Sequence, residues 1–186
     1  MSLPLSRRTA LGGAAALGVT APLALSAAPA RASSNRRPRA DVKAATTFLQ
    51  RVVDAYRSTG FRLAQSYQDD SGLNDIAFVY DNALAIIALL AAGDKPRARA
   101  IGDALLYAQA HDETHTDHRL RQAYHANTFV NDNGTVHFGW EFGLTGTAVG
   151  DMAWAGIALA QLARTTGRPE YLGGAVRIGQ WIQNNT

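Results

Sequence analysis

The sequence predicts an all-α fold built from helical hairpins, and three observations support this prediction. Residues 82–92 and 151–163 are apolar on almost every face of a helix, which is the pattern of a buried helix. Each segment is followed, across a short turn containing glycine and proline, by an amphipathic segment. Asp81 and Asp151 occupy equivalent positions in the two pairs, 70 residues apart, which indicates an internal repeat of one hairpin unit.

The first 32 residues have the pattern of an export signal. Arg7 and Arg8 precede an uncharged stretch rich in glycine and alanine, and Ala30 and Ala32 are small residues at the two positions that a signal peptidase reads. This segment resembles a twin-arginine (Tat) signal peptide. A membrane anchor is the alternative, but the glycines and prolines of the stretch make a poor membrane helix. We expect export by the Tat route to the cell envelope or the extracellular space, with no membrane anchor once residues 1–32 are removed.

Charge and composition exclude several functional classes. The chain has 18 Lys and Arg, 15 Asp and Glu, and no cysteine. Three of the arginines and none of the acids lie in residues 1–32, so 15 side chains of each sign remain, with no net charge to attract nucleic acid. The lack of cysteine excludes disulfides and thiolate chemistry. The sequence also lacks the nucleotide-binding and esterase motifs, so no cofactor is expected.

The predicted helical domain covers residues 41–186 and follows a polar leader, residues 33–40. Its first helix starts at Asp41, a favourable N-cap, and carries an apolar stripe at spacings of three and four. Residues 61–80 are expected to be irregular.

Two hairpins follow. The first joins residues 82–92 to an amphipathic helix over 96–111, and the second joins 151–163 to one over 170–183. The connection between them, residues 112–150, is polar, aromatic and rich in glycine.

The hairpins carry three short motifs, which are Tyr-Asp-Asn-Ala-Leu-Ala at 80–85, Gly-Asp-Met-Ala-Trp-Ala at 150–155 and Gly-Arg-Pro-Glu-Tyr-Leu at 167–172. They resemble the hairpins of six-hairpin (α/α)-barrel glycosidases, and the resemblance covers residues 42–186. It implies inner helices shielded by outer ones and a hydrolase that acts on a carbohydrate. Such a barrel has twelve helices, whereas five are predicted here. We therefore expect a partial (α/α)6 toroid, either as a piece of a longer protein or as an open half-ring that self-associates through exposed apolar flanks.

Two carboxyl groups are the predicted catalytic pair, because glycoside hydrolysis needs one protonated and one ionised carboxyl. Asp81 starts an inner helix, where the helix dipole favours the charged form, so it suits a base or nucleophile. Glu141 lies between Trp140 and Phe142, where desolvation would favour the protonated form of an acid, unless the side chain points to water. Helix capping is the alternative role of Asp81 and the preferred role of Asp151.

Aromatic and basic side chains are the predicted binding groups. Sugar rings stack on aromatic rings, so Trp140 and Tyr124 are expected in a cleft, whereas Trp154 is expected in the core. Arg119 and Arg121 could hold the carboxylate of a uronic acid, or could pair with acids such as the neighbouring Asp117. The expected substrate-binding residues are Tyr80, Asn82, Arg121, Tyr124, Trp140 and Asp151.

Other functions stay open from the sequence. One is a non-catalytic helical-repeat module that binds a glycan or a protein, or an inactive fragment. Another is a polysaccharide lyase or sugar epimerase on the same toroid, with Tyr124, His125 and Arg121 as its acid and base groups. The histidines of residues 111–118 have ligand-like spacing, but a solvated loop is the preferred interpretation and no metal is expected.

Overall fold

The structure, a computed structural model, describes residues 37–56, 60–68, 73, 75–139 and 143–186. These residues form five helices and two short strands, so the predicted helical class is confirmed at that level. The helices are α1 (Arg37–Val53), α2 (Val79–Ala91), α3 (Lys95–Ala110), α4 (Val149–Thr166) and α5 (Pro169–Asn185). The strands β1 (Ile76–Phe78) and β2 (Ala123–His125) pair antiparallel, with Ile76 opposite His125.

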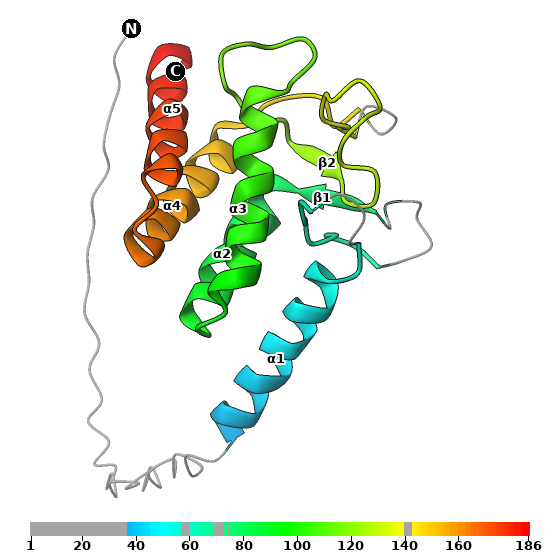
Figure 1. The fold of residues 1–186 in the computed structure, drawn as a ribbon, viewed down its shortest axis with the longest axis vertical. Helices are drawn as coiled ribbons and strands as arrows, with labels where there is room; N and C mark the ends of the chain where they lie inside the picture. The colour runs from blue at the N-terminus through cyan, green and yellow to red at the C-terminus, as the bar shows by residue number, and fades with distance from the viewer. Residues whose placement is uncertain (1–36, 57–59, 69–72, 74, 140–142) are drawn as a thin grey trace, which may run out of the picture. The chain divides into compact units, whose positions relative to one another are not determined.

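The helices α2 and α3, and likewise α4 and α5, form hairpins whose turns follow from local chemistry (Figure 1). Gly93, with a φ of 82°, reverses the chain after α2, and the Asp94 carboxylate then caps α3 by accepting from the Arg97 amide. Gly167 ends α4 in the left-handed conformation, with a φ of 72°, and Pro169 opens α5. Glycine tolerates positive φ without strain, and proline is favoured in the first turn of a helix.

The core lies where α2 packs against α3 and α4, while α4 packs against α5. α2 contributes Ile86 and Leu89, and α4 contributes Leu159 and Leu162, all fully buried. Close packing against α5 uses glycine, because a Cβ atom at Gly174 would overlap Leu106 and a Cβ atom at Gly102 would lie only 3.0 Å from Leu162. The small residues of these helices therefore set how closely the two hairpins approach.

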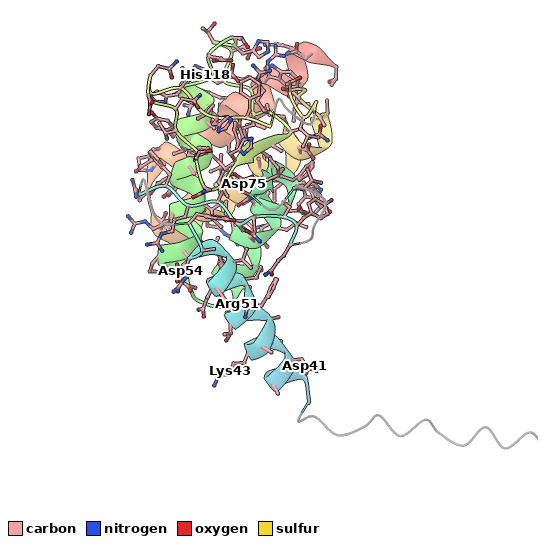
Figure 2. The ribbon with its side chains drawn as sticks, turned by 90° about the vertical axis from the view of Figure 1, so that its right-hand side faces the viewer. Asp41, Lys43, Arg51, Asp54, Asp75 and His118 are labelled. Carbon is pink, nitrogen blue, oxygen red and sulfur yellow. The ribbon has the colours of Figure 1, made fainter. Side chains whose placement is uncertain are left out.

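The position of α1 corrects one prediction. The helix begins at Arg37 rather than at Asp41, so Asp41 lies inside the helix and does not cap it. Pro38 falls in the first turn, where its missing N–H costs no helical hydrogen bond. Figure 2 shows α1, with Asp41, Lys43 and Arg51 along it, extending from the other helices of this unit.

Ion pairs attach the C-terminal end of α1 to the first hairpin. The Asp54 carboxylate accepts from Arg97 Nη2 at 2.6 Å and from Arg62 Nη1 at 2.7 Å. Gln50 donates to the Asp94 carboxylate at 2.8 Å. The same Asp94 that caps α3 thus also holds α1, which explains how a largely exposed helix keeps its place.

The strands were not predicted, since residues 61–80 were expected to be irregular. β1 runs directly into α2, and its partner β2 comes from the middle of the 112–150 connection. Three-residue strands carry too little alternation to be recognised locally, and their pairing joins residues about fifty positions apart.

One flank of the second hairpin is apolar and exposed. Trp154 and Ile157 on α4, and Leu172 and Val176 on α5, are between 38% and 53% exposed. The expectation that residues 151–163 are buried on all sides is therefore wrong for one side of α4. Within the described ranges, no helix combines the length and apolarity needed to cross a bilayer. The predicted signal peptide, residues 1–32, lies outside the described residues.

Two glycines of α5 test this packing. A Cβ atom at Gly174 would collide with Leu106 and lie 3.1 Å from Gln109 Oε1, whereas a Cβ atom at Gly179 would meet nothing within 4 Å. We expect Gly174→Ala to lower the free energy of unfolding by about 1–3 kcal/mol through overpacking. Gly179→Ala should instead raise it by about 0.5–1 kcal/mol, because alanine loses less backbone entropy in a helix. Urea denaturation followed by circular dichroism measures both changes, and equal effects of the two substitutions would contradict the packing described.

Candidate functional site

Asp81 and Asp151 occupy the same position in two neighbouring helices. α2 starts at Val79 and α4 starts at Val149, so each aspartate is the third residue of its helix. The N-cap residues are Phe78 and Ala148, whose extended backbones start the helices earlier than expected, and neither makes a side-chain capping bond. The prediction that Asp81 and Asp151 are N-caps is therefore wrong. Both carboxylates still lie in the first turn, where the helix dipole favours negative charge.

The negative charge of Asp81 acts on the Asp151 carboxyl group. Burial raises the pKa of Asp151 above its ordinary value, and the negative charge of Asp81 raises it further. Neither carboxyl makes a hydrogen bond or an ion pair with another residue in the part of the chain that the structure describes. Asp151 consequently holds its proton to a higher pH than an ordinary aspartate, beside a second carboxyl group that no described residue neutralises.

The same two helix starts carry two aromatic rings that contact each other. Tyr80 of α2 and Trp154 of α4 meet edge to face, with ring centroids 5.8 Å apart and planes at 90°. The rings are 39% and 38% exposed. The expectation that Trp154 packs in the core is wrong, because the side of α4 that carries it is open. We call Tyr80, Asp81, Asp151 and Trp154 the first-turn site.

Asn82, the next residue of the first motif, has a structural role instead. Its side chain is fully buried, and its oxygen accepts from the Ala64 amide at 2.8 Å. Its nitrogen donates to the carbonyls of Ala64 and Phe78. These bonds hold the segment after α1 against α2, so the amide is not available to a substrate.

Arg121 and Tyr124 are also buried and engaged. The guanidinium of Arg121 pairs with the Asp112 carboxylate, donates to the Thr145 carbonyl at 2.7 Å and lies over the ring of Phe138. The Tyr124 hydroxyl accepts from the Arg121 amide at 2.9 Å, and burial raises the pKa of that hydroxyl. Neither residue lines an open cleft, contrary to the sequence prediction, because the Tyr124 ring lies in the core and Arg121 is held by Asp112 and Thr145.

Two of the sequence candidates cannot be located. Trp140 and Glu141 fall in 140–142, outside the described residues. Glu141 therefore stays a prediction, and the acid role that it was assigned has a second candidate in Asp151.

Arg119 pairs with the neighbouring acid Asp117, which was the second of the two roles expected for it. It makes a double hydrogen bond to the Asp117 carboxylate, and the Trp181 indole donates to the same carboxylate at 2.9 Å. The nearby histidines are used in local contacts, with His111 stacked on Tyr107 at 3.7 Å and His118 bonded to the Gln109 carbonyl. Across the described residues, no three metal-ligating side chains come together.

Sequence reasoning missed the partners that organise the 112–150 connection. Asp112 is the buried partner of Arg121, and Asp75 contacts His125 at 3.0 Å, while the rings of His125 and His137 stack at 3.9 Å. Asp75 and His125 are fifty residues apart, so no local spacing could have joined them. Asp112 lies nine residues before Arg121 in a polar stretch that offers several other acids.

Comparison of the chain with protein-family models, with curated proteins and with solved structures found no match.

The Arg121–Asp112 pair makes the free energy of unfolding depend on pH in the acidic range. Burial alone would raise the pKa of Asp112, but hydrogen bonds from Arg121, Thr114 and His115 lower it to about 2. A carboxyl with a lowered folded-state pKa adds stability above its unfolded pKa and loses it as the pH falls through the folded value. We expect about 2 kcal/mol of unfolding free energy to be lost from this group between about pH 4 and pH 2. Urea titrations across that range measure the loss, and Asp112→Asn should flatten this part of the profile.

The electrostatic contact within the first-turn site has its own test. We expect Asp81→Asn to lower the pKa of Asp151 toward its ordinary value, because the neighbouring negative charge is removed while burial remains. Carboxyl carbon chemical shifts of Asp151 against pH measure this. Asp132→Asn, at an exposed loop position, is the matched control and should leave the Asp151 titration unchanged. An unaltered Asp151 titration in Asp81→Asn would contradict the juxtaposition.

Proposed function

We propose that this protein is a carbohydrate-active hydrolase of the glycoside hydrolase kind, acting on a polysaccharide or oligosaccharide at the first-turn site. The observation that carries the proposal is the interacting pair Asp81 and Asp151, with the pKa of one member raised. Hydrolysis of a glycosidic bond needs a carboxyl group that is still protonated and a second one that is ionised.

The environments of the two carboxyl groups suit these two roles. Asp151 is the acid, because burial and the charge of Asp81 favour its protonated form, so it can donate a proton to the leaving oxygen. Asp81 is the base or nucleophile, since it lies at the positive end of α2. This assignment moves the acid role from Glu141 to Asp151 and keeps the predicted role of Asp81.

The aromatic pair supports a sugar substrate. Tyr80 and Trp154 present two partly exposed rings at right angles, and a sugar presents C–H faces that stack on such rings. Tyr80 directly precedes Asp81, and Trp154 lies one helical turn after Asp151, so the rings and the carboxyl groups come from the first turns of the same two helices.

The architecture we propose is a partial (α/α)6 toroid of the six-hairpin type. Two helical hairpins support it. The first begins with α2 at Val79 and the second with α4 at Val149, so the hairpins start 70 residues apart. α2 and α4 would be inner helices, and α3 and α5 outer ones. The proposal includes Tat export to the cell envelope or the exterior, where polysaccharide substrates occur, and self-association through the exposed flank of α4 and α5.

A second candidate is a non-catalytic glycan-binding module. The exposed Tyr80–Trp154 pair favours it, because exposed aromatic rings can bind a sugar without catalysing a reaction. A lyase or epimerase finds less support, because Tyr124 and Arg121 are buried and engaged with Thr145, Asp112 and each other.

Measurement of catalytic turnover distinguishes the hydrolase from the non-catalytic binding module. We expect the protein to release reducing ends from at least one member of a panel of neutral and acidic polysaccharides. Asp81→Asn and Asp151→Asn should each lower kcat by about 100- to 10,000-fold, as expected for loss of an acid or base. Both variants should bind the substrate within a few-fold of the original affinity, and Asp132→Asn should retain full activity.

The binding-module alternative gives a different result. Oligosaccharide binding that is lost in Trp154→Ala, without turnover in the original protein, would favour that alternative. Turnover that survives both aspartate substitutions would show that the two-carboxylate mechanism is wrong.

A further inference from the structure

A small polar cavity lies between α5 and the segment that follows α3. Asp117, Arg177, Gln180, Trp181 and Asn184 are among its lining residues, and it encloses about 180 Å³. Figure 2 places His118, another lining residue, at the end of the helical unit opposite α1. Pockets that take drug-sized ligands usually enclose about 300–1,000 Å³, so this cavity suits a small chemical group.

Arg177 brings an uncompensated positive charge to this cavity. Its Nη2 donates to Gln109 Oε1 at 3.2 Å, while its Nε is buried and has no acceptor among the described residues. No acid of the described ranges lies within ion-pair distance of its guanidinium. A buried donor without an acceptor is unfavourable, so the protein itself does not satisfy all the donors of this guanidinium.

The acid in the cavity does not neutralise Arg177. The Asp117 carboxylate accepts from Arg119 Nη2 at 2.6 Å and from the Trp181 indole at 2.9 Å. Arg119 also lies over the Trp181 ring, 5.2 Å from its centroid, which keeps Arg119 beside Asp117. Because Arg119 balances the charge of Asp117, the charge left over in the cavity is that of Arg177.

We propose that this cavity binds a small oxyanion group, a carboxylate, phosphate or sulfate, through the guanidinium of Arg177. The planar guanidinium donates in a fixed fork that matches the oxygens of such a group. Its Nε is buried, so the Nη groups are the donors that an oxygen in the cavity would meet. The amides of Gln180 and Asn184 at the cavity wall offer further donors. None of the lining residues belongs to the first-turn site, so this inference goes beyond the proposed hydrolase and does not depend on it.

Nuclear magnetic resonance of the arginine side chains tests the proposal directly. The Nε–H signal of Arg177, assigned by its absence in Arg177→Lys, is followed while the protein is titrated with sodium sulfate, sodium phosphate or sodium galacturonate. Sodium chloride at matched ionic strength is the reference. We expect a saturable shift of this signal with at least one oxyanion and none with chloride. The most effective anion distinguishes a free inorganic ion from the carboxylate of a sugar.

Two variants with the same change of charge make the test specific. Tryptophan fluorescence reports on the cavity through Trp181, and it should show at least tenfold weaker anion binding in Arg177→Gln. Arg164→Gln, at an exposed arginine of α4, should bind as the original protein does.

Three results would overturn the proposal. The first is the lack of a saturable shift of the Arg177 signal with any of the three oxyanions, and the second is an equal response to chloride. The third is equal weakening in Arg177→Gln and Arg164→Gln, which would indicate general ionic screening. Should Arg177→Gln not fold, the signal of the unmodified protein decides alone.

Discussion

The packing of α4 against α2 is the contact on which the rest of this structure depends. Both helices are rich in alanine, leucine and isoleucine, so each must bury most of its surface, and each provides a large part of the cover for the other. Because they pack with their first turns side by side, Asp81 comes close enough to raise the pKa of Asp151. The same packing brings Tyr80 to Trp154. An arrangement driven by apolar burial thus produces a polar site at the helix ends.

Ion pairs fix the positions of α1 and of the long connection, which apolar packing alone does not determine. Asp54, Asp94 and Arg97 attach α1 to the first hairpin, and the buried pair of Arg121 and Asp112 joins two parts of the long connection. Such pairs gain little net stability over apolar contacts, but breaking one leaves a buried charge without a partner. They therefore fix where the connecting segments run. The exposed flank of α4 and α5 has no such constraint within the described residues and stays apolar.

Much of the helical organisation could be predicted, and much of the site could not. Apolar periodicity, Gly93, Gly167 and Pro169 located both hairpins to within a few residues. The same reasoning placed Tyr124 in a cleft and Trp154 in the core, and both assignments were wrong. Residue type indicates that an aromatic ring prefers contact with other side chains, but it does not say which side of a helix a neighbour will cover. That depends on segments far away in the chain.

The sequence by itself determined the helical class and the positions of the two hairpins, and it singled out Asp81 as a candidate residue. These features depend on interactions within a few residues. Only the tertiary structure decided that Asp151 is the partner of Asp81, that Asn82 and Arg121 serve the scaffold, and that Arg177 is left without an acid. Electrostatic effects depend on distance and burial in space. Residues 70 positions apart acquire such a relation only when two apolar helices have packed together.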